Sequence, residues 1–242
     1  ITLLYNSGIK ISKLGKLSNN QIKAAVQKLA DKKGDKDYFL DELKLSMFSY
    51  DQFKFQQTYN TILSEMSFRE AFIDVFIPFL EVIGLLCLSG SITASHEYFI
   101  KSLIMQKLLI NIERTQSVQP DKGEVYVLFL PDNEIHELGL LYVNYELSKE
   151  GYQTIYLGPS VPVNGLESII SCYSDVTFIS YFTVYPTKSE VNAYLKEIDS
   201  KILSKYKLKL NLLGKNAQEA NCNYDYIKVF NDVRDLLNKI VS

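Results

Sequence analysis

Hydrophobic residues repeat with a helical period over the first half of the chain. Between residues 35 and 115 they recur every three or four positions, and no stretch alternates as a strand would. The apolar positions are Leu40, Leu43, Met47, Phe55, Tyr59, Ile62, Phe72, Phe76, Phe79, Val82, Ile83, Leu86, Phe99, Leu103, Met105, Leu108, Leu109 and Ile112. Ser89 and Gly90 interrupt the pattern between the two longest segments. The spacing predicts a four-helix bundle over residues 34–115.

The pattern changes after a polar linker at residues 116–123. Short apolar runs, predicted as strands, occupy 124–130, 153–158, 176–182 and 209–214. Helical patterns follow them at 135–151, 164–174, 187–206 and 224–241. This alternation predicts a parallel sheet covered on both faces. The fold class is therefore α + α/β, with the bundle followed by a flavodoxin-like, doubly wound sheet over 124–242. Ligands of such sheets lie at the carboxyl ends of the strands.

Composition narrows the range of functions. Hydrophobic residues make up 47% of the chain, charged residues 22%, and the net charge is −2, so no global attraction to nucleic acid or anionic membranes is expected. Residues 1–33 are locally basic, which indicates either a solvated helix face or the tail of a nucleic-acid-binding domain. The three cysteines lack metal-ligand spacing and fit a reducing cytoplasm.

The sequence does not favour a membrane-spanning protein, a protein with a signal peptide, or an enzyme. The most apolar stretch, residues 71–90, contains Asp74, Pro78 and Glu81, so we interpret it as a buried bundle helix and expect no membrane span. No signal peptide is visible, and the start at Ile1 rather than at a methionine suggests a fragment or processed product. With two histidines in separate predicted domains and no glycine-rich phosphate loop, we expect a binding protein and not an enzyme.

His136 is the main candidate for chemistry, because it follows the first predicted strand at the carboxyl edge of the sheet. Neutral imidazole is a common metal ligand, and Glu134 is within range to accept its second ring N–H. Gly139 would let a bulky planar group approach the start of the following helix. The alternative is a loop histidine that only caps or solvates this helix.

These residues resemble a known signature. The segment Glu134-x-His136-x-x-Gly139 is similar to the cobalamin-binding motif Asp-x-His-x-x-Gly, in which glutamate is a known variant. Ser180 follows the third strand where that family has a Ser-x-Leu element, and Gly214 matches the first glycine of its Gly-Gly element. The resemblance implies that His136 is the lower axial ligand of the cobalt in adenosylcobalamin or methylcobalamin. The displaced dimethylbenzimidazole tail would enter a slot lined by Ser180 and Gly214 and bordered by Gly158.

The order of segments narrows the resemblance. Residues 1–18 look like the end of a MerR-type winged-helix DNA-binding domain, and the whole chain resembles the light-responsive MerR-type regulators of the CarH/LitR group. This implies a cobalamin-sensing transcriptional regulator in which ligand state, with light as a candidate signal, controls oligomerisation. Operator DNA would bind through the N-terminal domain, most of which is missing here, and the protein would form dimers or tetramers.

The upper face of the expected cobalamin site departs from that group. Its Trp-x9-Glu-His motif aligns with Cys87, Glu97 and Tyr98, so only the glutamate is kept, and the chain has no tryptophan. The light-sensing histidine aligns with Leu88, and His96 is a conceivable substitute. Two alternatives stay open: a corrinoid carrier for methyl transfer, and a degenerate sensor that has lost cobalamin.

Overall fold

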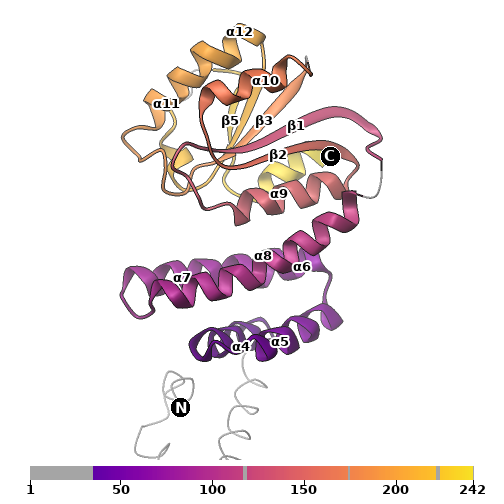
Figure 1. Cartoon of the computed structure of the whole chain (residues 1–242), viewed down its shortest axis with the longest axis vertical. Helices are drawn as coiled ribbons and strands as arrows, with labels where there is room; N and C mark the ends of the chain where they lie inside the picture. Colours follow the sequence, from indigo (N-terminus) through magenta and orange to yellow (C-terminus); the bar gives the residue numbers. More distant parts are fainter. Residues whose placement is uncertain (1–34, 117–118, 174, 222–223, 242) are drawn as a thin grey trace, which may run out of the picture. The chain divides into compact units, whose positions relative to one another are not determined.

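The computed structural model describes residues 35–116, 119–173, 175–221 and 224–241. The chain forms two compact units, which divide between Gln106 and Lys107 within helix α8 (Ala94–Gln116) (Figure 1). The last turns of α8 therefore belong to the second unit, ahead of the linker expected at 116–123. The expected tail of a DNA-binding domain, at residues 1–33, lies outside the described residues.

The described part of the first unit is helical, as its periodicity predicts. Its elements are α4 (Asp35–Ser49), α5 (Gln52–Glu65), α6 (Phe68–Ala71), the π-helical η1 (Phe72–Phe76), α7 (Ile77–Leu88) and the first half of α8. The apolar stripes of these helices form the core, where each of the following side chains is at most 1% exposed: Leu43, Met47, Phe55, Ile62, Phe72, Phe76, Phe79 and Ile83. The four expected helical segments are confirmed, with α6, η1 and α7 forming one of them.

Local chemistry sets where these helices begin and bend. Asp51 caps α5 by accepting the backbone N–H of Lys54 at 2.9 Å. Ser67 and Glu70 form a reciprocal capping box at the start of α6. The π-helical turn ends at Phe76, two residues before Pro78, whose missing N–H cannot take part in the regular helical ladder.

The continuous helix Phe68–Leu88 is the only one in the described part of the chain that is long and apolar enough to cross a membrane by length and composition. Core helices of soluble proteins pass the same test. One face of this helix is buried in the unit, and Asp74 pairs with Lys36 at 3.0 Å. These observations agree with the interpretation of a bundle helix.

The second unit contains a five-stranded sheet in the order β2-β1-β3-β4-β5, with every neighbouring pair parallel. The strands are β1 (Lys122–Pro131), β2 (Tyr152–Val161), β3 (Val176–Tyr181), β4 (Lys209–Leu213) and β5 (Ile227–Val229). This order is that of the flavodoxin-like doubly wound fold, so the predicted fold class is confirmed. The direction of winding reverses between β1 and β3, and the crevice at their carboxyl ends is where this fold binds ligands.

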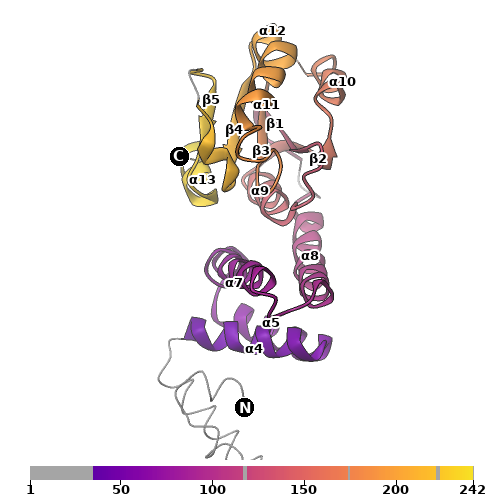
Figure 2. The ribbon, with the colours of Figure 1, turned by 90° about the vertical axis from the view of Figure 1, so that its left-hand side faces the viewer.

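Helices cover both faces of the sheet (Figure 1 and Figure 2). Helices α9 (Leu138–Lys149) and α13 (Val233–Val241) lie on one face, and α10 (Glu167–Ile170) and α11 (Val191–Ile198) on the other. The helix of α11 continues through η3 (Asp199–Leu203) into α12 (Ser204–Tyr206), and two short 3-10 turns, η2 (Val163–Leu166) and η4 (Asn216–Glu219), complete the unit. The core on the α10 and α11 face contains alternate residues of β1, including Val125, Val127 and Phe129.

The two largest differences from the sequence prediction concern the closing helix and the helix expected over 164–174. The closing helix, expected from residue 224, begins only at Val233, because Ile227–Val229 pair with β4 as an additional strand. Hydrogen bonds from Leu210 N to Tyr226 O and from Phe230 N to Leu212 O fix this strand. The helix expected over 164–174 is reduced to the 3-10 turn η2 and the single turn α10.

Candidate functional site

The carboxylate of Glu134 connects the loop after β1 to the loop after β3. Its Oε1 accepts the backbone N–H groups of Ile135 and His136, each at 2.9 Å, and lies 2.6 Å from Nδ1 of His136. Its Oε2 accepts three successive backbone N–H groups of residues 183–185, at 3.0, 2.6 and 2.8 Å. The Glu134 side chain is fully buried. One carboxylate therefore fixes both loops at the point where the sheet winding reverses.

The hydrogen bonds keep this buried carboxylate ionised. Burial alone would raise the pKa of Glu134, but hydrogen bonds from the His136 side chain and from the backbone N–H groups of Val184, Tyr185 and His136 outweigh it. The result is a pKa lowered from the ordinary 4.5 to about 2. At neutral pH the loops are thus organised around a negative charge.

This charge sets the tautomer of His136. An ionised carboxylate can only accept hydrogen bonds, so Nδ1 carries a proton and donates it to Glu134. In the neutral form of the ring the lone pair is then on Nε2, for which no partner is found among the described residues. The His136 side chain is 35% exposed. A carboxylate that orients an imidazole in this way is the usual support of a metal-ligating histidine.

Large apolar side chains are exposed on the same two loops. Ile135 is 66% exposed, Val184 43% and Tyr185 41%. Their backbone N–H groups all bind Glu134, so they lie close to His136. Asn216 supports the second loop by donating from Nδ2 to the carbonyl oxygens of Val184 and Pro186, each at 3.0 Å. The imidazole therefore has an apolar rim that suits a broad, flat, largely apolar ligand.

The other residues expected to bind the ligand lie at the same edge of the sheet. Gly158 is on β2 with a φ of +84°, and Ser180 is fully buried on β3, where its hydroxyl donates to the carbonyl oxygen of Phe129 at 2.9 Å. Gly214 follows β4 with a φ of +98°, and a Cβ there would lie 2.3 Å from the carbonyl oxygen of Phe182. Gly214 is thus required by close backbone packing.

We expected Gly139 to leave open space at the start of α9, but the structure shows that this space is filled. A Cβ at this position would lie 2.9 Å from Cε2 and 3.1 Å from Cζ of Tyr181, the last residue of β3. The ring of Tyr181 thus occupies the place in which we expected a bulky planar group to approach the helix.

In the first unit, Cys87 and Glu97 contact each other. The thiol of Cys87 donates to Oε2 of Glu97 at 3.1 Å, and Oε1 of Glu97 pairs with Lys101 at 3.0 Å. Burial, followed by the hydrogen bond and charge of Glu97, raises the pKa of Cys87 to about 11. The thiol is therefore protonated at neutral pH and is a poor metal ligand in this arrangement.

His96 makes its contacts within the first unit. Its Nδ1 contacts the hydroxyl of Thr93 at 2.9 Å, and its ring stacks on Tyr50 with centroids 4.7 Å apart. These contacts indicate a residue that stabilises the start of α8. Leu88 and Tyr98, which replace the resembled group's histidines, are 88% and 67% exposed.

The described residues contain no cluster of three or more histidine, cysteine or acidic side chains that could hold a metal ion. A metal at His136 would have to bring most of its own ligands, as the metal of a macrocycle does.

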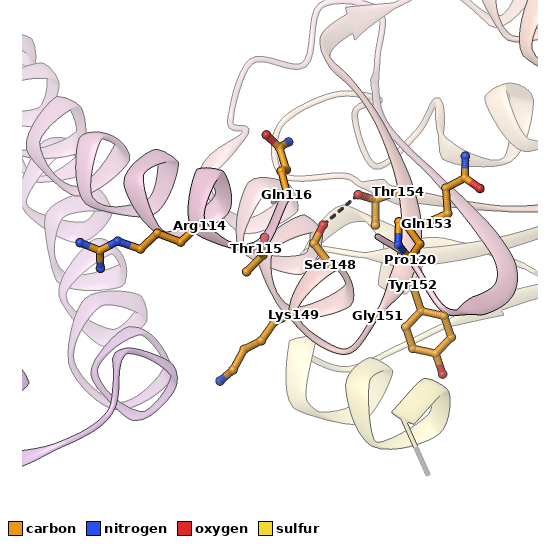
Figure 3. A pocket seen from close by; sticks show the side chains of 10 residues that line it. All are labelled: Arg114, Thr115, Gln116, Pro120, Ser148, Lys149, Gly151, Tyr152, Gln153 and Thr154. Atoms are coloured by element: carbon orange, nitrogen blue, oxygen red, sulfur yellow. Dashed lines mark hydrogen bonds between the residues drawn. The ribbon is translucent and has the colours of Figure 1, made fainter. Parts of the chain in front are cut away.

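A cavity of about 350 Å³ lies elsewhere, at the amino end of β2, where Ser148 and Thr154 share a hydrogen bond of 2.9 Å (Figure 3). It is therefore separate from the site at the carboxyl edge.

Sequence reasoning found Glu134 and His136 but missed their partners on residues 183–185. Those partners are backbone N–H groups, which leave no trace in the identity of the side chains. The sequence does hold a weak indication of the exposed residues Ile135, Val184 and Tyr185, because apolar residues are unusual in a solvated loop at the carboxyl edge of a sheet.

No known protein family matches the sequence, and no curated protein sequence does. Among solved structures, the chain is similar to the monomethylamine corrinoid protein of Methanosarcina barkeri, with a TM-score of 0.67 and 9% identity over 85% of this chain and 98% of that one. At this identity the likeness establishes the fold. Two further solved structures match. One is a cobalamin-binding protein of Desulfitobacterium hafniense, with a TM-score of 0.39 and 12% identity over 84% of this chain and 96% of that one. The other is the methanol:cobalamin methyltransferase complex MtaBC of M. barkeri, with a TM-score of 0.38 and 13% identity over 100% of this chain and 92% of that one.

Proposed function

We propose that this chain binds a corrinoid, with Nε2 of His136 as the lower ligand of its cobalt. The observation that carries the proposal is the Glu134 carboxylate, which fixes the tautomer of His136 and holds the apolar rim around it. A corrin ring already gives its cobalt four nitrogen ligands, so a single protein imidazole is sufficient. The fold similarity to a corrinoid protein supports the same proposal.

The residues present fit such a group. A corrin is broad, with an apolar ring and polar amide side chains, and exposed Ile135, Val184 and Tyr185 offer apolar contact beside the imidazole. When bound, the corrinoid supplies a cobalt centre that accepts and releases an alkyl group. Glu134 keeps the proton on Nδ1 of His136, and its charge makes the imidazole a stronger donor to the metal.

We propose a corrinoid carrier for methyl transfer as the leading role. The similar monomethylamine corrinoid protein is matched over 98% of its length, so a chain of this architecture makes up nearly all of that protein. A carrier holds the cofactor while separate methyltransferases act on it, which agrees with our expectation that this chain is not itself an enzyme. Its partners would then be methyltransferase subunits.

A cobalamin-sensing regulator is the second candidate, favoured by the basic, winged-helix-like sequence at residues 1–18. The two roles differ in their response to light. A regulator of the resembled group, loaded with adenosylcobalamin, would change oligomeric size on illumination, whereas a carrier would not. Size-exclusion chromatography in the dark and after illumination tests for this response, and a change of size would overturn the carrier role.

Binding itself is tested by titrating the full chain with aquacobinamide, which lacks a nucleotide base, and with aquacobalamin. The expected result is a shift of the corrinoid absorption bands when an imidazole replaces water on the cobalt. His96→Ala is the matched control, since it removes the other histidine of the chain. The proposal predicts the shift in wild type and His96→Ala and its loss in His136→Ala. Equal spectra for the two variants would overturn it.

A further inference from the structure

Two glycines of the expected cobalamin site, Gly139 and Gly214, are both covered by residues at or just after the end of β3. The ring edge of Tyr181 lies over Gly139, and the backbone of Phe182 lies against Gly214. Between them, the hydroxyl of Ser180 is directed to the carbonyl oxygen of Phe129 inside the sheet. In this conformation the end of β3 therefore fills the space next to α9.

Complete cobalamin needs space on the side of the ring that faces His136. The lower face carries a nucleotide tail that ends in dimethylbenzimidazole. If His136 replaces that base on the cobalt, the tail must lie on the same side of the ring as His136. Gly139 is three residues from His136 along the chain and is the second residue of α9, so we infer that the tail passes beside it. Cobinamide has no such base and makes no comparable demand.

The two contacts differ in how easily they can move. At Gly214 the neighbour is backbone, at 2.3 Å from the position of a Cβ, and it is fixed by the hydrogen bonds from Phe182 N to Leu213 O and from Asn216 N to Phe182 O. At Gly139 the neighbour is the ring of Tyr181, which can rotate about its side-chain bonds. Tyr181 is thus the movable part of this barrier.

Resting on the corrinoid-binding function above, we propose that Tyr181 determines which corrinoids the site accepts. With its ring over Gly139, the site takes a corrinoid without a lower base in preference to complete cobalamin. Cobalamin binds only when the ring rotates away, and the free energy of that rotation lowers its apparent affinity.

The test compares affinities for aquacobinamide and aquacobalamin by absorbance titration of the full chain. Wild type should bind cobinamide at least about tenfold more tightly than cobalamin. Tyr181→Ala should tighten cobalamin binding by about tenfold or more and leave cobinamide within about twofold. Tyr181→Phe keeps the ring and should retain the wild-type preference. Tyr181→Leu serves the same purpose as Tyr181→Ala if the latter does not fold.

The outcomes separate this inference from the proposed function. Equal affinity of wild type for both corrinoids, or tighter binding of cobalamin, would overturn the role of Tyr181 and leave His136 as the ligand. An unchanged preference in Tyr181→Ala would overturn it as well. If neither corrinoid shifts its spectrum with any variant, the proposed function itself fails.

Discussion

Replacing Glu134 with glutamine tests, without any bound ligand, whether the carboxylate of Glu134 holds the two loops of the site together. The change keeps the size of the side chain but removes its charge and turns one of its two oxygens into an N–H₂ group. Each oxygen of Glu134 faces three N–H donors, on residues 135–136 on one side and 183–185 on the other. Whichever way the amide turns, one set of three donors loses its acceptor.

The magnitude follows from the carboxylate itself. The lowering of its pKa from 4.5 to about 2 corresponds to about 3 kcal/mol of preference for the ionised form. Leaving buried donors unpaired costs a further ~1–3 kcal/mol, partly relieved because water can reach this loop. We expect Glu134→Gln to destabilise the two loops by about 3–5 kcal/mol.

Hydrogen exchange of the individual amides is the appropriate assay, because it reports local opening. The amides of residues 183–185 should exchange at least about a hundredfold faster in Glu134→Gln than in wild type. Glu190→Gln is the matched control, since Glu190 is exposed and accepts from the backbone N–H of Thr187 at 3.0 Å. If exchange at residues 183–185 is as slow in Glu134→Gln as in Glu190→Gln, the reasoning about Glu134 is refuted.

Two further predictions concern stability. Because the pKa of Glu134 is lowered in the folded state, its contribution to the stability of the fold is complete above about pH 4.5 and is lost as the pH falls towards 2. Over this window the free energy of unfolding should therefore drop by about 3 kcal/mol more in wild type than in Glu134→Gln. Parallel curves of unfolding free energy against pH would contradict the assignment. Gly214→Ala places a Cβ 2.3 Å from the carbonyl oxygen of Phe182 at a φ of +98°, so it should lower the free energy of unfolding, measured with denaturant, by at least about 2 kcal/mol. Gly84→Ala in α7 is the control: a Cβ there has no atom within 4 Å, so it should raise the free energy of unfolding by up to about 1 kcal/mol.

The sequence predicts the architecture well because the signals are local. Apolar spacing at three and four residues locates the helices of the first unit, and short apolar runs locate four of the five strands. The fifth, Ile227–Val229, is three residues long and continues into an amphipathic helix, so its apolar residues read as part of that helix. Only pairing with β4 distinguishes the two.

The site is predicted only in part for a related reason. His136 and Glu134 are neighbours along the chain, so their contact can be inferred from spacing. The N–H donors of residues 183–185 and the ring of Tyr181 reach the site from about fifty residues away, through the register of β3 beside β1. A single sequence holds no local pattern for such contacts. Cys87 and Glu97 are predicted from the sequence as residues of the upper face, but their hydrogen bond and the raised pKa of the thiol emerge only from the packing of α7 and α8.

The central claim is that the imidazole of His136 binds the cobalt of a corrinoid. Its most direct test is the electron paramagnetic resonance spectrum of cob(II)inamide bound to the His96→Asn variant, in which His136 is the sole histidine. Cobinamide carries no axial base, so any axial nitrogen coupling must come from the protein. The account predicts a three-line nitrogen splitting that becomes a two-line splitting when the histidine is labelled with nitrogen-15. A spectrum without nitrogen splitting, or one that labelling leaves unchanged, would contradict it.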